Sequence, residues 1–314
     1  MVRFIAWRIL TFVPIIVGAL AVSFLLLHLS PGSPALYILG ETATPEDVAR
    51  VDAQLGLDQP FLVQFGQWTL RALGGDFGTS VFGSLTVGEA VSEAIPATMS
   101  LALVSIVFAL LAGLSLGLLA GLNSGSPLDR LVTGLTSIGL AIPSFWLGVV
   151  VSFVFGVKLG WFPIVGFTPI EENPLEWFRG LILPALCLGL LGAAVIARHT
   201  RTALLDTLSR DYIRTARAKG LSPRRIRLVH VLKNAAVPIV TLTGLQFIGV
   251  LGGTVIVESI FGISGIGRLI VQAAHQKDIP IIQGIVVYMT VVVLVVNLII
   301  DVAYAALDPR MSVS

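Results

Sequence analysis

Six long apolar runs restrict what this chain can fold into. Crossing about 30 Å of hydrocarbon takes roughly 20 helical residues. Because lipid offers a bare backbone no hydrogen-bond partners, runs of this kind fold as helices. The sequence therefore predicts an all-α polytopic membrane protein with six transmembrane helices. The runs are Ile9–Leu29, Met99–Leu122, Leu131–Val157, Leu181–Ala197, Val237–Val257 and Ile285–Ala306, the last continuing past Asn297 and Asp301.

Positive charge is concentrated in one part of the chain. Of the 20 Lys and Arg residues, 10 lie between residues 198 and 233. If this loop is cytoplasmic, both termini are cytoplasmic, and 14 basic residues lie inside against 6 outside. The opposite orientation violates the positive-inside rule, so we expect both termini in the cytoplasm. The loop 123–130 does not affect this choice, because Asp129 and Arg130 cancel.

The predicted spans form a single transmembrane domain over residues 1–314. We expect a first span at 9–29, an extracytoplasmic segment with short surface helices at 30–96, and a five-span core at 97–306. The core includes a basic cytoplasmic loop at 199–236. The start of the chain is similar to a signal peptide, but its Ala-Leu-Ala triplet lies inside an apolar run longer than a typical signal core. We therefore expect an uncleaved first span.

The segment 30–96 contains two predicted short helices. In the first, Thr44 is the N-cap, Pro45 the first helical residue and Gly56 the stop. The second begins after Pro60 and ends at a Gly-Gly pair. It either lies on the membrane surface or caps the helix bundle, and both alternatives remain open. Its apolar face consists of Phe61, Phe65, Trp68 and Ala72.

Small residues recur at every fourth position in three of the predicted spans. Such residues let helix backbones approach closely in lipid, so they predict a compact bundle and not a ligand site. Pro143 is expected to kink the third span. The small residues are Gly113, Gly117 and Gly121, then Ala185, Gly189, Ala193 and Ala197, and finally Gly249 and Gly253.

The sequence contains no recognisable catalytic or metal-binding motif. Phosphate-binding G-x-x-x-x-G-K-[ST], zinc-binding H-E-x-x-H and the nucleophile motif G-x-S-x-G are all missing. The single cysteine, Cys187, excludes an intrachain disulfide and a cysteine-built metal site. The four histidines are scattered. We therefore expect a non-catalytic protein that holds no metal or cofactor.

The basic stretch YIRTARAKGLSPRRIRLVHVLKN at 212–234 predicts a helix, a sharp turn and a second helix. The first helix would stop at Gly220, and Ser222 would cap the second, which starts at Pro223. Basic loops commonly fix topology and lie near anionic lipid, and that explanation covers the charge alone. The turn and the small residues before it favour docking to a partner protein. A nucleic-acid site is not expected, since Tyr212 is the only aromatic platform.

This stretch resembles the cytoplasmic EAA loop of ABC-importer permeases. The chain as a whole is similar to the peptide, nickel and glutathione permease family, in its first-permease branch. The loop departs from Glu-Ala-Ala in having Arg214-Thr215-Ala216, and Ser33 and Ser264 replace residues that are usual in the family. The other similar stretches are HLSPGSPA at 28–35, LGLDQPFLVQF at 55–65, GGDFGTS at 74–80, SGSPLDRL at 124–131, AIPSFWLG at 141–148, VIVESIFGISGIGRL at 255–269 and YAALDPR at 304–310.

The resemblance implies a type I ABC-importer permease in the bacterial inner membrane. Implied partners are a second homologous permease, two ABC ATPase subunits that bind ATP and Mg²⁺, and an extracytoplasmic substrate-binding protein. Family substrates are di- and oligopeptides, nickel complexes, glutathione and related solutes, and the sequence does not select among them. The expected ATPase-docking residues are Arg214, Thr215, Ala216, Lys219, Gly220, Leu221 and Ser222.

The translocation pathway is predicted more weakly, from polar residues within the spans. Glu258 is expected to line the pathway or act as a gate, or else to reach water or cap a neighbouring helix at the outer end of its span. An ion-coupled secondary transporter is the alternative function. It would explain six spans and Glu258 but not the helix-turn-helix loop, and two matching halves with broken helices are not evident. The pathway candidates are Ser137, Ser144, Thr241, Thr243, Gln246 and Glu258.

Overall fold

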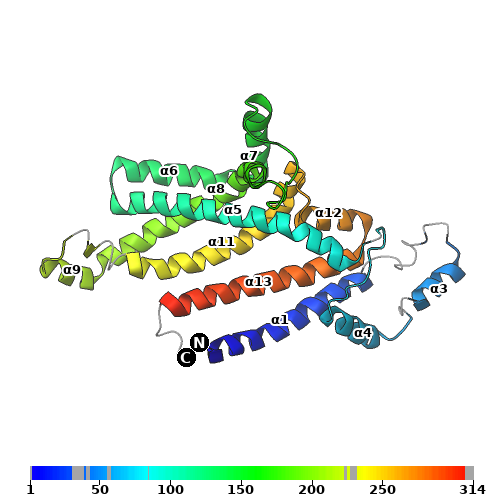
Figure 1. Ribbon diagram of the computed structural model, residues 1–314. Coiled ribbons are helices and arrows are strands. Elements are labelled where there is room, and N and C mark those ends of the chain that lie inside the picture. The colour runs from blue at the N-terminus through cyan, green and yellow to red at the C-terminus, as the bar shows by residue number, and fades with distance from the viewer. Residues whose placement is uncertain are drawn as a thin grey trace. The chain divides into compact units, whose positions relative to one another are not determined.

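The computed structural model describes residues 2–29, 39, 43–54, 58–83, 85–222, 225–226 and 232–307. These residues are almost entirely helical (Figure 1), with one isolated β-bridge between Thr79 and Thr86. Within them, five helices are long and apolar enough to cross a membrane, and a bent pair makes a sixth candidate span. The predicted all-α polytopic class is therefore confirmed. The five are α1 (Val2–Leu29), α5 (Val87–Leu122), α8 (Pro174–Ser209), α11 (Leu232–Phe261) and α13 (Ile279–Leu307).

The third span is broken. It consists of α6 (Pro127–Ala141), α7 (Ser144–Val151) and a π-helical continuation, η1 (Ser152–Lys158). Ile142 and Pro143 between α6 and α7 are both extended, and the axis turns by 99°. Proline removes a helical N–H and disfavours the helical region for the residue before it. The kink expected at Pro143 is thus a complete interruption of the helix.

The chain divides into two compact units. The first contains residues 97–264 and 296–307, and the second contains residues 2–96 and 265–295. In the first unit, α8 is the central helix: α6, α7 and α11 all pack against it, and α9 (Asp211–Ala218) follows at its C-terminal end (Figure 1).

Glycines bring α5 and α8 into close contact in the first unit. A Cβ atom on Gly117 would lie 2.6 Å from the carbonyl oxygen of Ala197 and 2.6 Å from Cβ of Thr200. From the other side, a Cβ on Gly189 would lie 2.8 Å from the carbonyl oxygen of Ser105. The predicted small-residue packing is confirmed for these two helices. It does not extend to Gly249, where a Cβ would have no atom within 4 Å.

In the second unit, α4 (Phe61–Leu73) packs against α1. The Phe24 ring of α1 has its centroid 5.4 Å from Phe61, 5.5 Å from Phe65 and 5.6 Å from Trp68. Trp68 and Ala72 are buried there with Leu20 and Phe24. The predicted apolar face therefore packs against helix α1, as a helix that caps the bundle would, while its place at the membrane surface stays a prediction. The opposite face leaves Leu62, Leu70 and Leu73 exposed.

The second unit contains two further helices, α3 and α12. The helix α3 (Pro45–Gln54) begins as predicted, because the Thr44 hydroxyl accepts the Asp47 N–H at 3.2 Å. The stop predicted at Gly56 lies outside the described residues. The helix α12 (Ile266–Gln276) packs with the beginnings of α5 and α13 around Val87, Ile266 and Ile285.

Candidate docking site

The helix α9 ends in the turn that the sequence predicted. Gly220 has φ +77°, a left-handed conformation that glycine adopts without strain. The Leu221 N–H donates to the carbonyl of Ala216 at 3.2 Å, the bond that closes a Schellman-type helix end. Ser222 Oγ then accepts the N–H of Arg225 at 3.4 Å, as an N-cap does. Pro223, Arg224 and residues 227–231 of the second predicted helix lie outside the described residues.

One face of α9 is seated on the bundle. Ile213 and Ala216 are buried together with Leu204 of α8 and with Ile226 after the turn. Ile213 and Ala216 are three residues apart and therefore share a helix face. Ala216 was expected to contact a separate ATPase subunit, but its side chain points inward and holds α9 against α8. Ala216 is therefore part of the buried face of α9 in this structure, and its contact with an ATPase stays a prediction.

The other face of α9 projects outward and is basic. Among the predicted docking residues, Arg214, Thr215, Lys219, Gly220 and Ser222 are exposed, while Leu221 is half-buried at the edge of the seat. The Arg214 side chain is 78% exposed and lies 3.7 Å from Asp211, a surface pair of little energetic value. Arg214 and Lys219 therefore remain available to a partner surface.

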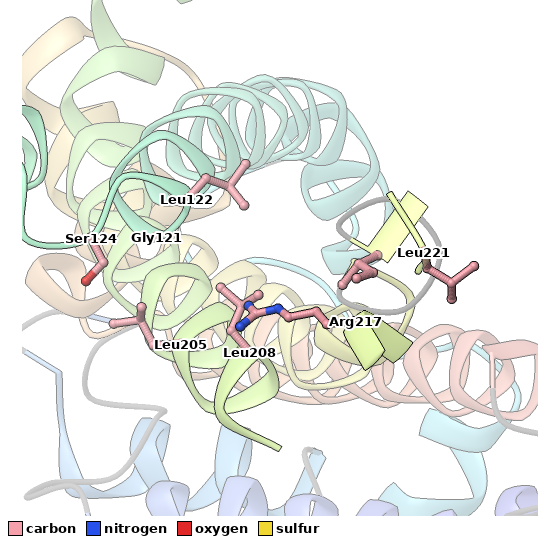
Figure 2. A pocket seen from close by; sticks show the side chains of 8 residues that line it. Gly121, Leu122, Ser124, Leu205, Leu208, Arg217 and Leu221 are labelled. Carbon is pink, nitrogen blue, oxygen red and sulfur yellow. The ribbon is translucent and has the colours of Figure 1, made fainter. Parts of the chain in front are cut away.

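A hollow of about 450 Å³ lies beside the seated face. It is open to the outside, and Figure 2 shows the Arg217 side chain extending into it from α9. The helix is therefore anchored along Ile213 and Ala216 but does not fill the space next to the ends of α5 and α8. The lining residues are Gly121, Leu122, Ser124, Leu205, Leu208, Arg217, Leu221 and Ile226.

An ion pair that the sequence did not suggest lies one helical turn from this seat. Arg201 of α8 donates from Nε and Nη2 to the two carboxylate oxygens of Asp129, at 2.6 and 2.9 Å. The Asp129 side chain is 5% exposed and the Arg201 side chain 30%. The partners are 72 residues apart, and no local pattern links them. Asp129 entered the sequence prediction only in the charge balance of its loop, and the structure adds a partner for it on α8.

The predicted pathway residues differ in their surroundings in the structure. Thr243 lines an apolar cavity of about 650 Å³ between α5, α11 and the end of α13, and the other five candidates do not line it. Ser137 is exposed on α6, and Ser144 begins α7. Thr241 and Gln246 are half-buried.

Glu258 lies in the interior of the first unit. It is fully buried and accepts the Thr98 hydroxyl at 2.6 Å, so α5 and α11 meet at this carboxylate. The expectation that it reaches water is wrong for this structure. Among the described residues, no group of three or more His, Cys, Asp or Glu side chains could hold a metal ion.

The comparison with protein families covers nearly the whole chain. Residues 113–313 match the family described as binding-protein-dependent transport system inner membrane component, and residues 1–102 match its N-terminal counterpart. The chain belongs to this family. It is a multi-pass permease of a binding-protein-dependent ABC importer, located in the bacterial inner membrane, as the resemblance implied.

Individual relatives agree with this assignment. A putative peptide transport system permease protein of Brucella abortus (strain 2308) is 39% identical over 99% of both chains. The glutathione transport system permease protein GsiC of Salmonella typhimurium (strain LT2) is 40% identical over 98% of both. The solved methionine ABC transporter MetNI is 20% identical, with a TM-score of 0.57 over 69% of this chain and 96% of that chain, and it supports the fold.

Proposed function

We propose that this chain is one of two homologous permease subunits of an ATP-driven importer, and that a separate ATPase subunit docks on α9 and the Gly220 turn. The observation that carries the proposal is the two-sided character of α9. Ile213 and Ala216 fix the helix to α8, while Arg214 and Lys219 project from it. A helix held in this way can transmit a force applied to its exposed face. The positive-inside rule supports a cytoplasmic position for this face, because the loop is basic.

The docked ATPase would act through α8. Because α6, α7 and α11 all pack on α8, a displacement of α9 is passed to most of the first unit. ATP binding would thereby favour one of two arrangements of these helices, as a ligand shifts a two-state equilibrium. ATP and Mg²⁺ belong to the ATPase subunits in this scheme, since the chain has no phosphate-binding loop.

The proposed cargo is a peptide or a small peptide-like solute. This follows from the relatives named for peptide and for glutathione transport. A second permease would complete the pathway, and an extracytoplasmic binding protein would select the solute. An ion-coupled secondary transporter is disfavoured, because the described residues contain one bent helix pair and not two matching ones.

Charge reversal on the exposed face tests the docking proposal. The double variant Arg214→Glu/Lys219→Glu is expected to bind the ATPase about tenfold more weakly. It would place negative side chains against an ATPase surface that complements a basic helix, and like charges repel. Binding is measured by co-purification, and function by ATP-dependent uptake into proteoliposomes. Arg71→Glu, an exposed basic residue in the second unit, is the matched control. Full ATPase binding by the double variant, or uptake by the permease alone with only an ion gradient, would overturn the proposal.

Gly220 offers a second test that separates charge from backbone conformation. A Cβ at this position meets no atom within 4 Å, but φ +77° strains most residues by about 1–2 kcal/mol. Asn and Asp tolerate this conformation best and have nearly the same shape. We expect Gly220→Asn to retain most ATP-dependent uptake and Gly220→Asp to lose it, measured in the same proteoliposomes. Equal uptake by the two variants would show that no partner surface senses charge at this turn.

A further inference from the structure

We propose that Asp129 and Arg201 are positioning residues that make α6 move with the docking helix. The inference rests on the proposed docking function and adds a path by which docking reaches the broken third span. The ion pair ties the beginning of α6 to the part of α8 on which α9 is seated. On this view, α6 is carried as a rigid segment up to the interruption at Ile142 and Pro143.

The geometry of the pair supports a fixed connection. Both carboxylate oxygens of Asp129 are engaged by Arg201, a bidentate arrangement that fixes orientation as well as distance. Asp129 Oδ2 also accepts the N–H of Gly125 at 2.9 Å, and the Asp129 N–H donates to Ser126 Oγ at 3.2 Å. The Asp129 carboxylate, carried by the first turn of α6, therefore links the turn before α6 to α8.

The pair adjoins the seat of α9. Arg201 precedes Leu204 by one helical turn, and Leu204 is the α8 residue buried with Ile213 and Ala216. The end of α5 also closes on this point: a Cβ on Gly121 would lie 2.8 Å from Leu204 Cδ1 and 3.4 Å from Cα of Arg201. Three segments of the bundle and the docking helix thus meet within one turn of α8.

The segment that moves with α8 ends at the interruption of the third span. Helix α6 ends at Ala141, and α7 continues at 99° to it after two extended residues. A rigid segment that moves with α8 can change its angle to α7 there, because extended residues between two helices can absorb changes in backbone angles. Removing the ion pair would leave α6 packed on α8 but no longer fixed at the end nearest to α9.

The test measures solute taken up for each ATP hydrolysed, in the complete transporter at equal amounts of assembled complex. We expect Asp129→Asn and Arg201→Gln each to lower this ratio about tenfold, the upper range for residues that couple distant sites. The double variant should be no worse than the poorer single variant, because the pair acts as a unit. Glu176→Gln, which removes the exposed Arg179–Glu176 pair within α8, is the matched control and should leave the ratio unchanged.

Three outcomes would overturn the inference. The first is an unchanged ratio in the single variants. The second is a double variant whose loss is the product of the two single losses, which would mean that the residues act independently. The third is a combination of two results: Asp129→Asn and Arg201→Gln fail to assemble, and Arg201→Lys assembles with full coupling. Because lysine keeps the charge but cannot make the bidentate contact, this would mean that the contact is not needed for coupling. If instead the unaltered permease holds no ATPase, the docking proposal itself is wrong.

Discussion

Replacing Gly117 with valine is expected to remove folded permease from the membrane. A Cβ at this position would lie 2.6 Å from both the carbonyl oxygen of Ala197 and Cβ of Thr200, and 3.0 Å from Thr200 Cγ2. A backbone carbonyl cannot rotate away as a flexible side chain can, so α5 and α8 would have to separate. Overpacking of this kind costs about 3 kcal/mol or more. That cost is comparable to much of the stability of an ordinary domain.

The effect can be isolated with alanine variants of the permease purified by itself. Gly117→Ala is expected to lower the thermal unfolding midpoint in detergent, measured by size-exclusion chromatography after heating. Gly249→Ala is the matched control, because α11 has open space around that position. Gly249→Ala should leave the free energy of unfolding unchanged or raise it by up to about 1 kcal/mol, because alanine has the higher helix propensity. Equal midpoints for the two variants would contradict the close contact between α5 and α8.

The features that the sequence predicted well are those set by neighbours along the chain. The Gly220 turn follows from the left-handed conformation that glycine supplies, and the Thr44 cap from a hydroxyl placed three residues before an amide. The stripe at Gly113, Gly117 and Gly121 repeats once per helical turn, so it had to face a single neighbour. In each case the physical cause lies within a few residues.

The features that could not be predicted join residues far apart in the chain. Asp129 and Arg201 belong to different helices, and nothing near either residue indicates the other. The packing of α4 against Phe24 likewise depends on α1 being the neighbouring helix, which the sequence of α4 does not indicate. The orientation of Ala216 was predictable in part, since the helical period places it on the face of Ile213, but the small size of alanine was taken as a sign of exposure.

The pathway candidates show why polar residues in a span are weak markers. The Ser137 hydroxyl donates to the carbonyl of Thr133 at 2.8 Å, and the Thr243 hydroxyl donates to the carbonyl of Ile239 at 2.8 Å. Serine and threonine hydroxyls in helices commonly donate a hydrogen bond to the backbone carbonyl one turn earlier. Such a residue needs no water and no solute, so its presence in an apolar run does not place it on a translocation pathway.

Glu258 differs from these residues, and its removal is the second large effect that we expect. Its carboxylate lies in the interior, where it accepts the Thr98 hydroxyl at 2.6 Å across two helices. Glu258→Ala would leave a cavity and deprive a buried hydroxyl of this acceptor, a loss of about 2–4 kcal/mol in unfolding free energy. Glu258→Gln keeps the shape and an oxygen that can accept the same bond, so its stability should stay close to that of the unaltered protein.

These two variants separate a structural role from a gating role. The unfolding midpoint and ATP-dependent uptake are measured for each, with Thr98→Val added to complete a double-mutant cycle. If Glu258 holds α5 to α11, adding Thr98→Val to the Glu258→Ala variant should lower the unfolding midpoint little further. Uptake by these variants should then decline as their stability declines. A stable Glu258→Ala protein that transports nothing would instead assign the carboxylate to the pathway. A buried carboxylate that only joins two helices can be exchanged for an amide, whereas one that must change its charge during transport cannot.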